Sequence, residues 1–293
     1  FLKQAASALN HESAEFQERL RKGLKAGLTY PQARAKALEM EDTWASVLTS
    51  PNNILGIEYL RAAEDLHSPM EFYTISRKGS GYHEDTLADA NFPSASAIRG
   101  IIRNSLSKDK DLLDLASHLP AVTHPAYTGA VPVFVDDFSE LLNAAVLQMQ
   151  ATFSIADLSP ELAARLAKPP YFPLSFEERI QALKTRQLTY TRVSRALLHL
   201  VLGMREEDIS RWKDEGYALY ARILGFRRQS SPLLSCLHKK SSIPLITKMA
   251  DAAQNLSPSA LALLEQEVYA SHLYQTVRMK RSGVFQNEYT EGL

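Results

Sequence analysis

Helix-start patterns recur along much of this sequence and constrain the chain to a largely helical fold. A Ser or Thr that is followed by Pro, or by Glu or Gln three residues later, is typical of the first turn of a helix, because such side chains bond to backbone N–H groups that lack partners. Phe16, Leu20 and Leu24 add an amphipathic helix that ends near Gly27. We also predict helices from four pattern positions: Thr29, Ser50, Ser159 and Ser175.

Two segments have the composition of β-strands. Glu71–Arg77 is rich in aromatic and β-branched residues, and Val131–Val135 is a short apolar run. We predict a strand in each segment. A glycine-containing loop follows the first, so Arg77 and Lys78 lie at the end of a predicted strand, where α/β folds place their ligands.

The stretch Ser94–Arg99 predicts a helix start that can hold an anion. Ser94 and Ser96 can cap backbone N–H groups, and Arg99 adds a planar cation one turn into a helix that is expected to continue through Leu106. A simple helix cap and a phosphate site are both consistent with this pattern. The predicted strand, the basic loop and this helix in succession favour a nucleotide site.

Two consecutive asparagines stand at the start of the helix predicted from Ser50. Asn52 and Asn53 place amide donors and acceptors there. These groups serve either alternative capping or contact with a ligand, and the sequence leaves both interpretations open.

Positive charge is concentrated in one part of a chain that is neutral overall. The sequence has 33 basic and 33 acidic residues, but residues 184–248 hold 13 basic and 5 acidic ones. This excess predicts a polyanionic partner for that segment.

A helix predicted from Thr189 to Gly203 lies within this basic segment, and its two faces differ. At about 100° per residue, Arg192, Arg195 and His199 share one face, which we expect to be left free. The opposite face is expected to pack through Val193, Ala196, Leu197 and Leu200. Cations beside an aromatic ring suit single-stranded RNA, whereas a merely solvated face is the alternative. The candidate RNA-binding residues are Lys184, Arg186, Tyr190, Arg192 and Arg195.

Further basic residues extend the same predicted surface: Arg222, Arg227, Arg228, Lys239, Lys240 and Lys248. Four large apolar or aromatic side chains stand among them, and we expect these to be core residues rather than stacking platforms for bases. They are Tyr217, Tyr220, Leu224 and Phe226.

The remaining reactive side chains are expected to be structural. Cys236 stands in an apolar helical pattern, so it is predicted to be buried and inert. His118 and His124 lack partners at the spacing of metal ligands, so no metal site is predicted. Asp136 and Asp137 precede a predicted helix, which indicates capping.

The sequence predicts a cytoplasmic protein with two domains. It holds no apolar run of the length that spans a membrane and opens with no signal peptide. The polar run Ser107–Asp111 predicts a domain boundary, which divides the chain into residues 1–107 and 108–293.

Several of these segments, taken in order, resemble the bacterial tRNA(Met) cytidine acetate ligase family of the nucleotidyltransferase superfamily. The resemblance implies the C-terminal part of an α/β, Rossmann-type ATP-binding domain over residues 1–107, followed by a mostly α-helical tRNA-binding domain over residues 108–293. The similar stretches are Pro51–Leu60, Ser76–Arg77 with Tyr82–His83, Ser94–Arg99, Lys184–Arg186 with Tyr190–Arg192 and Arg195, and, more weakly, Ser241–Lys248.

The resemblance also implies an activity and a set of contacts. Members of the family activate acetate as acetyl-adenylate with ATP and join it to N4 of the wobble cytidine of elongator methionine tRNA. Mg²⁺ is the usual companion of nucleotide phosphates. By similarity of motif, the residues in contact with ATP are Asn52, Arg77 and Lys78, and those at its phosphates are Ser94, Ser96 and Arg99.

The sequence departs from the family pattern in one respect, because it contains no His-x-Gly-His motif. The resemblance therefore implies that the catalytic histidines lie outside these residues and that this chain alone is an inactive fragment. Its catalytic residues stay unknown, as does the oligomeric state. Two alternatives remain open: a non-catalytic RNA-binding module, and a nucleotidyltransferase that acts on a small molecule.

Overall fold

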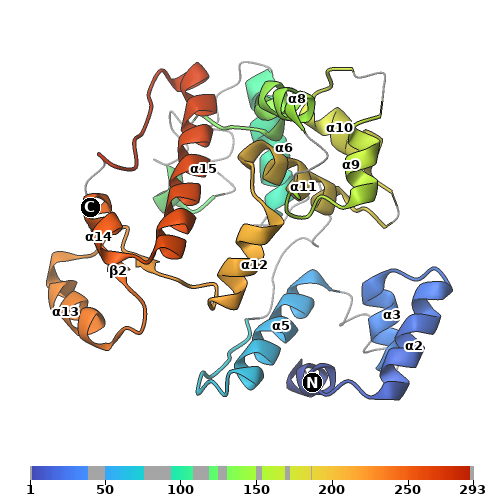
Figure 1. Ribbon diagram of the computed structural model, residues 1–293. Coiled ribbons are helices and arrows are strands. Elements are labelled where there is room, and N and C mark those ends of the chain that lie inside the picture. The colour runs from blue at the N-terminus through green and yellow to red at the C-terminus, as the bar shows by residue number, and fades with distance from the viewer. Residues whose placement is uncertain are drawn as a thin grey trace. The chain divides into compact units, whose positions relative to one another are not determined.

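The computed structural model describes residues 2–38, 50–75, 94–107, 119–124, 131–149, 154–168, 172–185 and 187–290 (Figure 1). The chain forms two compact units, Phe1–Ser80 and Gly81–Leu293. The helix that begins after Ser94 therefore belongs to the second unit. The division of function between residues 1–107 and 108–293 stays a prediction.

The described helices of the first unit are α1 (Leu2–Asn10), α2 (Ala14–Lys25), α3 (Tyr30–Ala37) and α5 (Pro51–Asp65). Leu9, Phe16 and Ile57 are buried in their shared apolar core. At Gly23 the helices α2 and α3 approach so closely that a Cβ would lie 3.0 Å from the Cβ of Ala33. A larger side chain at position 23 would push the two helices apart.

The second unit is mostly helical. Its described α-helices are α6 (Ala95–Ser107), α8 (Ser139–Gln148), α9 (Pro160–Leu166), α10 (Phe176–Leu183), α11 (Tyr190–Leu202), α12 (Glu206–Asp214), α13 (Ser231–Lys240), α14 (Ala252–Asn255) and α15 (Pro258–Ser282). Short 3₁₀ turns are η2 (Ala121–Thr123), η3 (Val135–Phe138), η4 (Arg228–Ser230) and η5 (Met249–Asp251). Within the described residues, no helix has the length and apolar character needed to cross a membrane.

The predicted helix starts are confirmed. The backbone N–H of Thr29 donates to Oε1 of Gln32 at 3.1 Å at the start of α3. Ser175 and Glu178 form a reciprocal capping box at the start of α10, with distances of 2.9 and 3.2 Å. Ser159 Oγ caps α9. Local capping chemistry thus sets where these helices begin.

The main core of the second unit lies between α8, α9, α10 and α11. Phe176, Ile180 and Leu142 are fully buried there, and α11 contributes the apolar face predicted from sequence. Its residues Val193, Ala196, Leu197 and Leu200 are all buried. The helix ends at Gly203, whose φ of 64° is a left-handed conformation that glycine adopts without strain.

A smaller core lies under a two-stranded parallel sheet. β1 (Ala221–Arg222) pairs with β2 (Leu245–Ile246), and α13 lies on the crossover between them. Ile246 packs with residues of α14 and α15, among them Ala252, Leu264 and Val268.

Both predicted strands are wrong in the residues that the structure describes. Glu71–Ile75 has no regular secondary structure, and the side chains of Tyr73 and Ile75 are 84% and 95% exposed. A β-prone composition yields a strand only where a neighbour can pair with it. At the second segment the Asp137 carboxylate accepts from the Phe134 N–H at 2.7 Å, which turns the chain into η3.

Predictions of burial near α13 are also wrong. Cys236 is exposed, and α13 has no buried residue. Tyr217, Leu224 and Phe226 are 60%, 75% and 47% exposed, whereas Tyr220 packs against the smaller core. Apolar spacing on a helix or loop does not by itself say whether another element covers that face.

Candidate nucleotide and RNA sites

The start of α6 has the properties of an anion site. Ser94 is 4% exposed, and its Oγ accepts from the Ala97 N–H at 3.1 Å, so it serves as the helix cap. The N–H groups of Ala95 and Ser96 occupy the first two helical positions, which have no intrahelical acceptor. Ser96 and Arg99 are exposed, and the first turn contains no acidic residue. Positive charge and unused donors therefore gather at this helix end.

The second candidate nucleotide element is the start of α5. Ser50 is the N-cap through its carbonyl, which accepts from the Ile54 N–H at 2.9 Å, while its hydroxyl makes no capping bond. Asn52 is exposed in the first turn. It lies in the first unit and α6 in the second, so the structure describes them separately. Arg77 and Lys78 fall outside the described residues.

Helices α10 and α11 are joined by a hydrogen bond between Tyr190 and Glu177. The Tyr190 hydroxyl donates to the carboxylate at 2.5 Å. Burial and this bond raise the pKa of Tyr190 to about 12, so the phenol is neutral in the physiological range. Burial opposes ionisation of Glu177, but hydrogen bonds from Tyr190 and Gln181 outweigh it and lower the pKa of Glu177. The exposed ring of Tyr190 is thereby held in place beside α10.

The basic face of α11 is not left free, which corrects the prediction from sequence. Arg195 donates two hydrogen bonds to Asp157, at 2.7 and 3.1 Å. Nδ1 of His199 lies 3.2 Å from the same carboxylate and 3.1 Å from the Ala156 carbonyl. The hydrogen bond from Arg195 is the main cause that lowers the pKa of Asp157, so this carboxylate stays ionised at neutral pH. The Arg195 charge is therefore largely balanced, although its side chain remains 56% exposed.

Arg192 and Lys184 are exposed as well, and neither forms an ion pair with a carboxylate in the described residues. Arg186 lies outside the described residues. Asp157 and Glu177 are partners of the predicted RNA face that the sequence pattern does not reveal. Asp157 adopts a left-handed φ of 61° in a turn far from α11 along the chain, and no local pattern signals that approach.

The structure brings α6 close to the candidate RNA face. The Arg103 guanidinium, one turn beyond Arg99, lies 5.2 Å from the centre of the Phe134 ring. Its charge also acts on both Glu177 and Tyr190. The predicted phosphate helix and the predicted RNA helix therefore share one side of the second unit.

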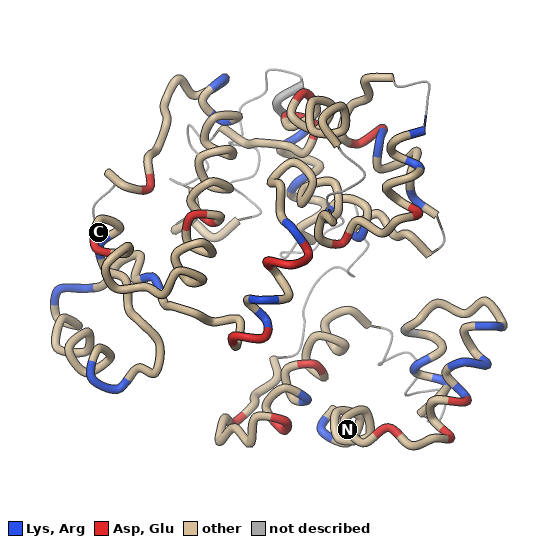
Figure 2. Tube along the Cα trace, in the orientation of Figure 1, with Lys and Arg blue, Asp and Glu red and all other residues tan. Residues whose placement is uncertain are grey.

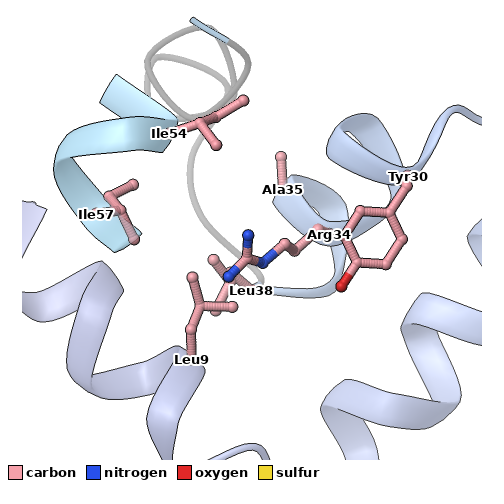
Figure 3. Close-up of a pocket in the computed structure, with 7 residues that line it drawn as sticks. All are labelled: Leu9, Tyr30, Arg34, Ala35, Leu38, Ile54 and Ile57. Atoms are coloured by element: carbon pink, nitrogen blue, oxygen red, sulfur yellow. The ribbon is translucent and has the colours of Figure 1, made fainter. Parts of the chain in front are cut away.

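A small apolar pocket of about 130 Å³ lies in the first unit, between Tyr30, Leu9 and Ile57 (Figure 3). Arg34 reaches into its edge, where its guanidinium pairs with Glu58 at 2.9 Å. The Nε of Arg34 is buried and has no hydrogen-bond partner among the described residues.

Throughout the residues that the structure describes, in both units, no group of three or more His, Cys, Asp or Glu side chains could hold a metal ion.

A capped helix start with an exposed arginine, set beside a basic face, fits an enzyme that handles nucleotides. A family model described as HIGH Nucleotidyl Transferase matches residues 1–288, and the chain belongs to this family. Relatives that carry the name tRNA(Met) cytidine acetate ligase include one from Acetivibrio thermocellus, which is 32% identical over 92% of this chain and 67% of its own length. Another, from Clostridium novyi, is 33% identical over 85% of this chain and 63% of its own length.

Solved structures of TmcAL from Thermotoga maritima have the same fold. The apo form aligns with a TM-score of 0.79 at 24% identity and covers all of this chain and 71% of the Thermotoga chain. The form bound with alpha-thio ATP aligns with a TM-score of 0.76 at 25% identity, over all of this chain and 70% of the other. The predicted family and the nucleotidyltransferase fold class are thereby confirmed, whereas the restriction to the C-terminal part of that domain stays a prediction.

Proposed function

We propose that the protein containing this chain is an ATP-dependent ligase that acetylates N4 of the wobble cytidine of elongator tRNA(Met). The observation that carries this proposal is similarity along almost the whole chain to relatives of that name, together with a TmcAL structure bound to an ATP analogue. In the first step an acetate oxygen attacks the α-phosphorus of ATP and pyrophosphate leaves. In the second, the cytidine amine attacks the acyl carbon and AMP leaves.

The start of α6 suits the first step. Arg99, Ser96 and the free N–H groups beside them would offset the negative charge that builds up on the phosphates. Ser94 holds this first turn of α6 in place, because its buried hydroxyl caps the helix. Asn52, Arg77 and Lys78 are proposed to make the other contacts with ATP.

A divalent ion is expected to accompany ATP. The described residues offer no cluster of metal-ligating side chains, so they do not fit a metal site made by the protein alone. Mg²⁺ commonly keeps several waters and binds through substrate phosphates, and we propose that it enters with ATP in this way.

The region around α10 and α11 is proposed to hold the tRNA through Lys184, Arg186, Tyr190, Arg192 and Arg195. The exposed Tyr190 ring offers a stacking surface, and Arg192 and Lys184 offer charge for phosphates. Since Arg195 already pairs with Asp157, its contribution to binding is expected to be smaller than that of Arg192.

Substitution of both arginines tests this assignment. Arg192→Ala with Arg195→Ala in the full-length protein is expected to weaken binding of a tRNA(Met) transcript about 10- to 100-fold and to reduce its dependence on salt. The matched control is Lys22→Ala with Lys25→Ala on the exposed side of α2, which also removes two charges. Unchanged affinity and salt slope in the arginine variant would remove α11 from the RNA site.

A further inference from the structure

A cleft of about 900 Å³ opens beside the two-stranded sheet. Its walls come from the segment after β1, from α13, from the segment after β2 and from residues 288–290. Phe226 and Tyr289 both line it, and they are 47% and 57% exposed. Two aromatic side chains that remain open to solvent within one cleft of this size are typical of a binding surface.

The part of the chain that supplies most of the cleft's walls carries only positive charge. Residues 217–250 include six Lys or Arg residues and no Asp or Glu. Lys248 lines the cleft, and Arg227 and Arg228 follow Phe226 directly. Among the described residues, no carboxylate forms an ion pair with these three cations. Figure 2 shows basic residues on and next to α13, at the lower left of the view.

Glu288, the acidic residue that lines the cleft, already has its negative charge paired with a cation. The Glu288 carboxylate accepts from Ser271 Oγ and lies 2.5 Å from the Arg222 guanidinium. The hydrogen bond from Ser271 has the largest effect on the pKa of Glu288, and the bond from Arg222 has the next largest. Both lower this pKa, so the carboxylate is ionised at neutral pH. This anion therefore does little to oppose a polyanionic ligand.

Contacts of Glu288 and Tyr289 with His272 hold one wall of the cleft in place. The Glu288 N–H donates to Nε2 of His272 at 3.2 Å, and the Tyr289 ring stands edge-on to that imidazole with centres 6.0 Å apart. Because Tyr289 is held before any ligand arrives, binding would cost little additional ordering of this side chain.

We propose that this cleft binds unpaired nucleotides of the RNA substrate, with bases against Phe226 and Tyr289 and phosphates at Lys248 and Arg227. The proposal rests on the proposed function, which supplies the RNA. Exposed rings next to unpaired cations match the two needs of single-stranded nucleic acid, a stacking platform and charge along the backbone. The cleft lies beyond α11 and α12 along the chain, so it adds a second point of contact with the tRNA.

Affinity measurements with matched variants test the cleft. Phe226→Ala in the full-length protein is expected to weaken binding of a tRNA(Met) transcript about 5- to 150-fold, the range for loss of one stacked base. Phe226→Tyr retains a ring and is expected to bind like the wild type. Lys248→Gln is expected to lower the slope of log affinity against log salt by somewhat less than one. Leu233→Ala is the control, because Leu233 is 57% exposed on α13 and does not line the cleft.

A fluorescent variant reports contact directly. Phe226→Trp places an indole in the cleft, and its emission is expected to be quenched when the transcript is added, relative to the wild-type signal. Tight transcript binding by the wild type, with unchanged affinity and salt slope in Phe226→Ala and Lys248→Gln, would overturn the cleft proposal and leave the proposed function intact. Quenching by polyglutamate but not by tRNA would assign the cleft to an acidic protein partner and overturn it as well. A wild-type protein that binds no tRNA would contradict the proposed function itself.

Discussion

Full-length protein with Arg99→Ala is expected to release pyrophosphate from ATP roughly 10²- to 10³-fold more slowly than the wild type in the presence of acetate and tRNA. Arg99 is exposed one turn into α6, and the unused N–H groups of Ala95 and Ser96 precede it. If this helix start stabilises charge that develops on the phosphates, loss of the guanidinium raises the barrier of the adenylation step. The measurement is the initial rate at saturating ATP, together with the KM for ATP.

The neighbouring arginine of the same helix supplies a control. Arg103 lies one turn further along α6 and packs over the Phe134 ring. Arg103→Ala is therefore expected to leave the adenylation rate close to that of the wild type. Equal rates in the wild type and the Arg99→Ala variant would mean that α6 begins in a cap and not in a phosphate site.

Phe176→Ala is expected to lower the free energy of unfolding of the second unit by about 3–5 kcal/mol. Phe176 is fully buried between α8, α9, α10 and α11, and the loss of its ring would leave a cavity that these helices can only partly close. Urea denaturation measures the change. The sequence has two tryptophans, Trp44 in the first unit and Trp212 in the second. In a Trp44→Phe background the fluorescence of Trp212 reports on the transition of the second unit.

The same substitution at an exposed phenylalanine provides the comparison. Phe172 is 64% exposed and precedes α10 in the chain. Phe172→Ala is expected to change stability by less than about 1 kcal/mol. A comparable loss at both positions would argue against a core centred on Phe176.

Helices were predictable from sequence because their signals are local. The capping box of Ser175 and Glu178, the cap at Ser159 and the apolar face of α11 each depend on residues a few positions apart. The same holds for Ser94, whose bond to the Ala97 N–H spans three residues. Such patterns fix where a helix begins and which side can pack.

What could not be predicted depends on residues far apart in the chain. Asp157 approaches Arg195 from 38 positions away and turns a face predicted to be free into a paired one. Phe226 belongs to an apolar run that looks like core, yet no element covers it fully in the described structure. The strand predicted at Glu71–Arg77 likewise required a neighbour that its own residues do not specify. In each case the missing information is which other segment lies alongside.

We expect the full-length protein to transfer acetate to one cytidine of tRNA. The most direct measurement incubates it with ATP, labelled acetate and a transcript of elongator tRNA(Met), and quantifies pyrophosphate and labelled nucleosides. We expect one pyrophosphate to be released per N4-acetylcytidine, formed at the wobble position. A transcript with uridine at that position, which lacks the exocyclic amine, should accept no label. Pyrophosphate release that needs neither acetate nor tRNA, or tRNA binding without any acetyl transfer, would contradict this expectation.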